Sequence, residues 1–252
     1  MGGSWIYVIG GPLVLLLAGV IVVFALASIK ARRTGEDSPV IRVTLVVAAL
    51  WAGFSVLGAT VALILSLAGP EVPISFPVQE FWPQLPDGTT MDGPTATLVS
   101  GGFTSVEGMV ADLSIGARIC WGISQALSWL IPGAIAALLA IACFQLRAGR
   151  AFAPVVARMA MITAVVVMVG GVAAQVVGDV AGGMAAAEVL QWSGGSYEEV
   201  AGIEDVFAAW WPKPGFGITF PFWPIAAGLG FAALSVILRH GSQLERDTAG
   251  LV

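Results

Sequence analysis

Long apolar segments separated by two acidic, polar stretches dominate the pattern along the chain. The apolar runs cover residues 5–29, 41–68, 119–146, 154–177 and 218–238. Each is long enough for the roughly 20 residues with which a helix crosses the hydrocarbon core of a bilayer. The pattern therefore predicts an all-α integral membrane protein, with about five transmembrane helices in a bundle that forms one membrane domain over residues 1–252.

The stretches 70–118 and 179–217 are predicted to be loops outside the cytoplasm. Each carries six carboxylates, and the first is also rich in Pro, Gly and Thr. Segments 72–78 and 95–106 are β-branched and aromatic, which is compatible with short strands that their prolines would confine to sheet edges. Whether these loops fold into a subdomain stays open at the level of sequence.

Composition supports the lipid bilayer as the surroundings of this chain. Of its 252 residues, 58% are hydrophobic and 11% are charged, whereas soluble domains carry about 25% charged residues. The net charge of -5 argues against direct binding to nucleic acid, because phosphate contacts need clustered Lys and Arg.

The distribution of charge orients the predicted spans. Nine of the eleven Lys and Arg residues fall on the side assigned to the cytoplasm, and twelve of the sixteen Asp and Glu residues fall on the other side. Because cytoplasmic loops carry an excess of Lys and Arg, this predicts an outside N-terminus, a cytoplasmic C-terminus and an odd number of spans. Run 5–29 is followed, not preceded, by basic residues, which favours a retained helix over a signal peptide.

Few polar residues fall within the predicted spans. They are Gln125, Gln145 and Gln175, while Arg118 and Asp179 fall at predicted outer ends. Ionisable groups at membrane depth often mark functional sites, but groups at span ends reach the headgroups at little cost. We interpret Arg118 and Asp179 as a candidate ion pair at the outer ends of two helices.

The sequence predicts no enzyme, cofactor or metal site. It contains no P-loop, nucleophile elbow or H-E-x-x-H pair in a fitting context. Cys120 and Cys143 fall about 34 Å apart on one predicted helix, too far for a disulfide, and His240 is remote from both. The adjacent Gly170 and Gly171, and the spacing of Gly178 and Gly182, predict close helix packing.

Two further segments carry recognisable patterns. In segment 143–162 a short turn between helices contains Gly149, Phe152 and Pro154. In segment 220–252 the last helix leads to Gly241, Leu244, Glu245 and a final Val252. Both patterns resemble the bacterial membrane family catalogued as domain of unknown function 2975, and the resemblance covers about the last four spans.

The resemblance implies a bacterial plasma-membrane protein with four spans and no established biochemistry. Genes of that family often neighbour small helix-turn-helix regulators, which implies a membrane component of a regulatory pair. This chain departs from the pattern at Ala153, where the family prefers Ser or Thr, and in its additional span 5–29.

We therefore hypothesise a non-enzymatic polytopic protein that serves as a regulatory, sensory or interaction component. The outer loops would meet a partner or signal, and the basic segments 147–158 and 239–246 would contact a cytosolic partner. The candidate cytoplasmic contact residues are Arg147, Gly149, Arg150, Phe152, Pro154 and Arg158. A small-solute transporter that uses the three glutamines and kinks at Pro132 and Pro224 is the alternative, as is an accessory subunit of a larger membrane complex. A protein partner in the membrane or cytosol, and homo- or hetero-oligomers, stay open.

Overall fold

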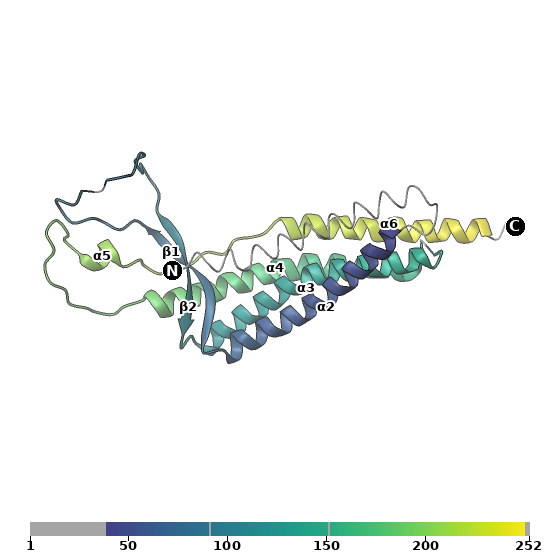
Figure 1. Ribbon diagram of the computed structural model, residues 1–252, viewed down its shortest axis with the longest axis horizontal. Coiled ribbons are helices and arrows are strands. Elements are labelled where there is room, and N and C mark those ends of the chain that lie inside the picture. Colours follow the sequence, from purple (N-terminus) through teal and green to yellow (C-terminus); the bar gives the residue numbers. More distant parts are fainter. Residues whose placement is uncertain (1–38, 91, 151, 250–252) are drawn as a thin grey trace. The chain divides into compact units, whose positions relative to one another are not determined.

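The computed structural model describes residues 39–90, 92–150 and 152–249, and the predicted span 5–29 lies outside them. The described residues form four long helices, one short helix and a two-stranded sheet (Figure 1). The long helices are α2 (Pro39–Ala68), α3 (Ile115–Arg147), α4 (Pro154–Leu190) and α6 (Trp223–Ala249), and the short helix is α5 (Val206–Trp210).

Four helices in the described ranges are long and apolar enough to cross a membrane. They are α2, α3, α4 and the Trp223–Leu244 part of α6. The helices predicted from the runs at 41–68, 119–146, 154–177 and 218–238 are thus confirmed as helices, and they indicate a membrane protein. Many of their large apolar side chains are exposed, as expected of helix faces that meet lipid.

The prediction that a loop begins at residue 179 is wrong. The apolar run stops at residue 177, but the helix continues through Asp179 and Glu188 to Leu190, so both carboxylates are helical and not in a loop. Residues 184–190 are rich in Ala and other helix formers, which propagate a helix whether or not lipid surrounds it. The 37 residues of α4 make a helix about 55 Å long at 1.5 Å per residue, well beyond a hydrocarbon core of about 30 Å.

The predicted limits of α6 also differ from the structure. The helix begins at Trp223 and continues to Ala249, so residues 218–222 are not helical and most of the expected polar tail is. Pro224 lies in the first turn, where its missing N–H and fixed φ are tolerated. Pro224 therefore lies in the first turn of α6 and does not kink the helix, whereas Pro132 does lie inside α3.

The acidic stretch between α2 and α3 contains the antiparallel strands β1 (Glu71–Phe81) and β2 (Phe103–Ala111). This confirms the strand expected at 72–78, while the second strand begins only at Phe103. Along β1 the side chains of Val72, Ile74, Phe76 and Val78 are buried, and alternation places them on one face of the sheet.

The chain divides into two compact units, and each long helix contributes residues to both. Among the described residues, the first unit comprises 39–55, 132–164 and 228–249, and the second comprises 56–131 and 165–227. Of the residues that the structure describes, six of the eight Lys and Arg belong to the first unit, and twelve of the fourteen Asp and Glu belong to the second.

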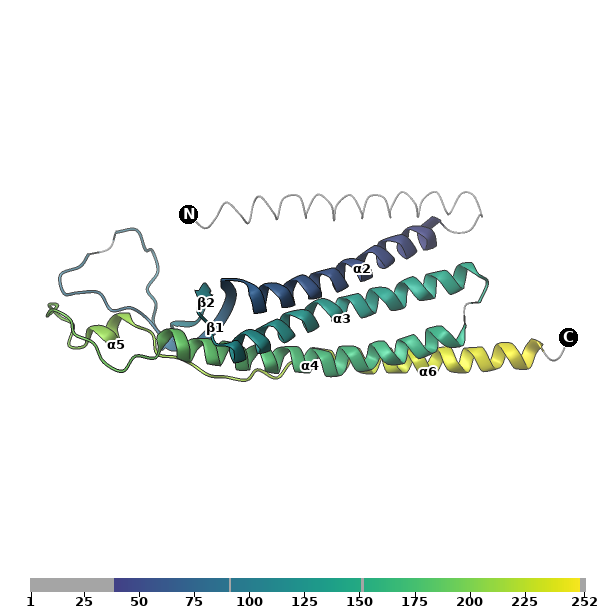
Figure 2. The same cartoon turned by 90° about the horizontal axis from the view of Figure 1, so that it is seen from below.

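In the first unit, hydroxyl groups hold α4 to its two neighbours. Ser235 Oγ of α6 donates to the Ala157 carbonyl at 2.7 Å, and Thr163 Oγ1 of α4 faces the Ala134 carbonyl of α3 at 3.5 Å. In the second unit, Ser124 Oγ of α3 donates to the Ala174 carbonyl of α4 at 2.8 Å. In Figure 2, α3 lies between α2 and α4. Such hydroxyl bonds let helices associate where water cannot compete.

The core of the second unit joins the sheet to α3 and α4. The buried face of β1 packs with Leu113, Ala117 and the alanine-rich end of α4 around Ala181, Ala185 and Ala186. Small side chains on α4 allow the strand to approach closely, since the Ser75 carbonyl would lie only 3.0 Å from a Cβ at Gly182. The extension of α4 beyond its apolar run is therefore the platform on which the sheet rests.

Candidate functional site

The turn between α3 and α4 is built by its glycine and proline. Gly149 has φ +72°, a conformation that favours glycine after the last turn of a helix. Its N–H donates to the Leu146 carbonyl at 3.1 Å, and the Arg150 N–H donates to the Gln145 carbonyl at 2.9 Å. Pro154 is the first residue of α4. Both residues therefore have the structural roles that the sequence pattern suggests.

Phe152 brings this turn into contact with α6. A Cβ added at Gly241 would lie 2.5 Å from Cδ1 and 2.6 Å from Cε1 of the Phe152 ring, so the ring lies directly against the glycine backbone. Only glycine leaves room for a ring at this position. The two segments that carry the family resemblance, far apart in sequence, therefore meet at one place in the first unit.

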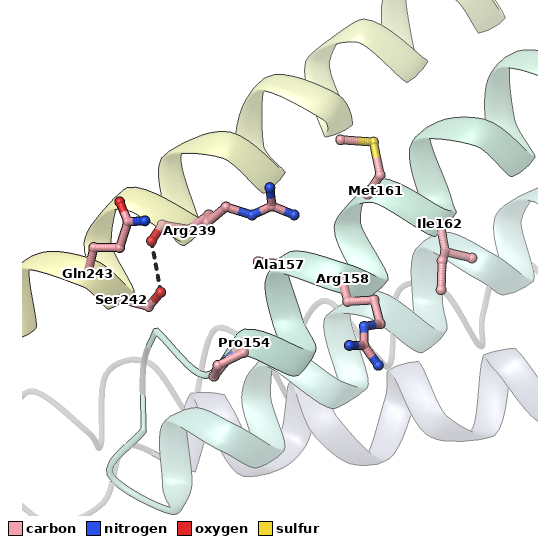
Figure 3. A pocket seen from close by; sticks show the side chains of 8 residues that line it. All are labelled: Pro154, Ala157, Arg158, Met161, Ile162, Arg239, Ser242 and Gln243. Carbon is pink, nitrogen blue, oxygen red and sulfur yellow. Dashed lines mark hydrogen bonds between the residues drawn. The ribbon is translucent and has the colours of Figure 1, made fainter. Parts of the chain in front are cut away.

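A pocket of about 400 Å³ opens between α4 and α6 near this contact (Figure 3). Arg158 and Arg239 contribute its positive charge, and the remaining lining residues are Pro154, Ala157, Met161, Ile162, Ser242 and Gln243. Of the predicted contact residues, Pro154 and Arg158 thus line the pocket and Phe152 adjoins α6. Arg147 and Arg150 are exposed and lie outside its lining.

Arg118 and Asp179 do not form the predicted ion pair in the described part of the chain, because each has other partners. The Arg118 guanidinium donates to the carbonyls of Gly69 at 2.6 Å and Pro70 at 3.3 Å, and its Nε donates to Leu113 at 3.0 Å. Arg118 thereby ties the start of α3 to the end of α2.

Asp179 serves a separate connection. Its carboxylate accepts from Gln175 Nε2 at 2.8 Å and from the Thr219 N–H at 2.6 Å, which fixes the segment before α6 to α4. Glu188, also on α4, accepts from the Ser114 N–H at 2.8 Å, next to the first turn of α3. A carboxylate at a helix N-terminus is favourable because it satisfies free N–H groups and opposes the helix dipole.

We expect Arg118→Ala to lower the free energy of unfolding by about 1–3 kcal/mol, since carbonyls that lose a charged donor are left poorly satisfied. Lys213→Ala, an exposed cation in the same unit, is the matched control and should stay within about 0.5 kcal/mol. Denaturation in detergent, followed by tryptophan fluorescence, measures both. Combining Arg118→Ala with Asp179→Asn should give additive losses of stability, because the two side chains have separate partners. A coupling energy above about 1 kcal/mol would instead show that the two side chains interact as an ion pair.

The three candidate glutamines make no hydrogen bond to one another in the described part of the chain. Gln175 binds Asp179, and Gln125 belongs with it to the second unit, whereas Gln145 belongs to the first. The Gln145 Oε1 atom is buried and accepts no hydrogen bond from the described residues.

The predicted close packing of helices is confirmed at Gly171 and Gly178, whereas Gly182 packs against the strand β1. A Cβ at Gly178 would lie 2.7 Å from Ser124 Oγ on α3, and one at Gly171 would lie 2.6 Å from Pro224 Cβ on α6. Gly170 is looser, with its nearest contact 3.7 Å away at Ile131. These glycines therefore set the distances between helices and between α4 and the sheet.

Sequence reasoning missed the anchoring roles of residues in the second acidic stretch. Trp211 Nε1 donates to the Leu190 carbonyl at 2.9 Å, at the end of α4, and Trp210 Nε1 donates to the Gln84 carbonyl at 2.7 Å. Asp205 caps α5 by accepting from the Phe207 and Ala208 N–H groups. An Asp directly before a short apolar run was the available signal for the cap.

The described residues contain no cluster of three or more His, Cys, Asp or Glu side chains that could hold a metal ion. Cys120 and Cys143 are free. The arrangement offers structural contacts in the second unit and a cationic pocket beside a conspicuous turn in the first. No family model, curated protein or solved structure matches this chain.

Proposed function

We propose that this protein is a non-enzymatic, multi-pass component of a bacterial plasma membrane with a regulatory, sensory or interaction role. Its interaction surface would be the α3–α4 turn, residues 147–158, together with the adjoining part of α6. The contact between Phe152 and Gly241 carries the proposal, because it holds the two most distinctive sequence segments together as one composite surface.

Charge supports the orientation in this proposal. Of the described residues, the first unit holds the turn and six of the eight basic ones, and the second holds twelve of the fourteen acidic ones. Under the positive-inside rule the first unit would face the cytoplasm. With the four spans described and a fifth at residues 5–29, the N-terminus would lie outside and the C-terminus inside.

Membership of the family of unknown function 2975 is part of the proposal, resting on the same two segments. A role beside a cytosolic regulator would follow from it. Transport is less favoured, because Pro224 lies in the first turn of a helix and the glutamines fall in different units.

Site-specific photocrosslinking in native membranes tests the proposal. A photoreactive residue at exposed Arg150 should give a discrete adduct with a cytosolic or membrane protein, identified by mass spectrometry. The same residue at exposed Glu198, in the second unit, is the matched control and should not give that adduct. Phe152→Ala should reduce the yield at position 150 several-fold, because the turn loses its support on α6. Absence of an adduct at 150, or an equal adduct at 198, would refute the proposed surface.

A further inference from the structure

We propose that the pocket between α4 and α6 binds the phosphate headgroup of an anionic phospholipid. This site shares Pro154 and Arg158 with the proposed protein contact, but lipid binding there does not require that a protein partner exists. Arg158 and Arg239 would hold the phosphate, and the apolar wall at Met161 and Ile162 would face the lipid beyond its headgroup.

The two arginines approach the pocket from different helices. Figure 3 shows Arg239 extending from α6 toward Met161 on α4, with Arg158 one turn before Met161 and the two guanidinium groups apart from one another. Among the described side chains, neither guanidinium has a hydrogen-bond or ion-pair partner, and no carboxylate lines the pocket. Two cations on one pocket wall repel each other, and an anion between them would relieve that repulsion.

The chemistry of the lining residues suits a phosphate group. Guanidinium groups bind phosphate oxygens through paired N–H donors. Gln243 adds an amide, and the Ser242 hydroxyl donates to the Arg239 carbonyl at 2.8 Å, which leaves its oxygen atom free to accept. The pocket also lies beside the first turns of α4, where a helix dipole favours negative charge.

A lipid is favoured over free phosphate as the source of this group. The lining residues of α6 fall within Trp223–Leu244, and those of α4 fall within Pro154–Leu190, both of which are helices apolar enough to cross a membrane. Met161 and Ile162 are exposed on the same wall. Arginine at the end of an apolar helix, with apolar side chains one turn deeper, matches the boundary between headgroups and acyl chains.

Lipid binding to the full chain, purified in a neutral detergent, tests this site. Native mass spectrometry and thermal shift would compare phosphatidylglycerol, phosphatidylcholine and inorganic phosphate. We expect phosphatidylglycerol to bind at least tenfold more tightly than phosphatidylcholine, and inorganic phosphate at equivalent concentration to give no thermal shift. Equal binding of both lipids would overturn the proposal, and tight binding of inorganic phosphate would overturn its lipid source.

Two variants and a matched control locate the binding. Arg239→Gln should weaken phosphatidylglycerol binding about tenfold, and adding Arg158→Gln should abolish the preference over phosphatidylcholine. Arg42→Gln removes an exposed arginine of the same unit outside the pocket and should stay within twofold of the wild type. Met161→Trp keeps every charge but fills the space beside the apolar wall, so it should also weaken phosphatidylglycerol binding. It therefore tests the pocket even if an arginine variant does not fold. Wild-type affinity in the double variant or in Met161→Trp would exclude this pocket.

Discussion

Replacing Phe76 with alanine is expected to lower the free energy of unfolding of the second unit by about 3–5 kcal/mol, as typical for an aromatic side chain removed from a core. Phe76 is only 4% exposed and belongs to the cluster that joins β1 to α3 and α4. Its backbone also adjoins Gly182, where the strand crosses α4. The loss should be large because α4 and the strand cannot both move to fill the cavity.

Met109→Ala on the partner strand is the control for this prediction. Met109 is 61% exposed, so its truncation should change stability by less than about 1 kcal/mol. Tryptophan fluorescence during denaturation in detergent reports on the second unit, since Trp192, Trp210 and Trp211 belong to it. Limited proteolysis of residues 82–102 gives a second readout, in which Phe76→Ala should be cut faster. Equal stability of the two variants would mean that the sheet does not rest on α4.

Enlarging Gly171 is expected to destabilise the packing of α6 on α4. The added Cβ of Gly171→Ala would lie 2.6 Å from Cβ and 2.7 Å from Cγ of Pro224. Pro224 is fully buried, and its ring cannot rotate away as a flexible side chain would. Overpacking of this kind costs about 1–3 kcal/mol, and Gly171→Leu should cost more and separate α6 from α4.

The neighbouring glycine provides a closely matched control. Gly170→Ala makes the same chemical change one residue earlier in α4, but its nearest contact would be 3.7 Å away at Ile131. Both variants gain the same helix propensity, about 1 kcal/mol for glycine to alanine. We expect the melting temperature in detergent to fall for Gly171→Ala and to stay level or rise for Gly170→Ala. The reverse order would show that α6 does not pack on α4 at Pro224.

The long helices could be predicted from sequence because the signal is local. A run of about 20 apolar residues has few stable outcomes other than a membrane helix. Hydropathy did not predict the ends of α4 and α6. A helix can continue past its apolar run where the following residues favour helix and other elements pack against the added turns. The β1 strand was expected from the β-branched and aromatic content of segment 72–78. The same signal at 95–106 placed the second strand too early, because β2 (Phe103–Ala111) is defined by its pairing with β1.

The candidate sites divide in the same way. The roles of Gly149 and Pro154 could be predicted, because the backbone angles that glycine and proline favour depend on the residue itself and not on distant contacts. The partners of Arg118 could not be predicted from sequence. They are the backbone carbonyls of Gly69 and Pro70, and every residue has such a carbonyl. The pocket of Arg158 and Arg239 was likewise hidden, since the two residues lie far apart in the chain and only packing of α4 on α6 unites them.

By itself, the sequence determined the membrane character of the chain, its helices and the separation of basic from acidic segments, because hydropathy, propensity and charge act over a turn or a loop. Only the tertiary structure decided that α4 extends to support the sheet, that Phe152 meets Gly241, and that Arg118 and Asp179 bind different partners. Those outcomes depend on which elements pack against each other. Small residues on one element allow close contact only if the fold brings a second element, distant in the chain, against them.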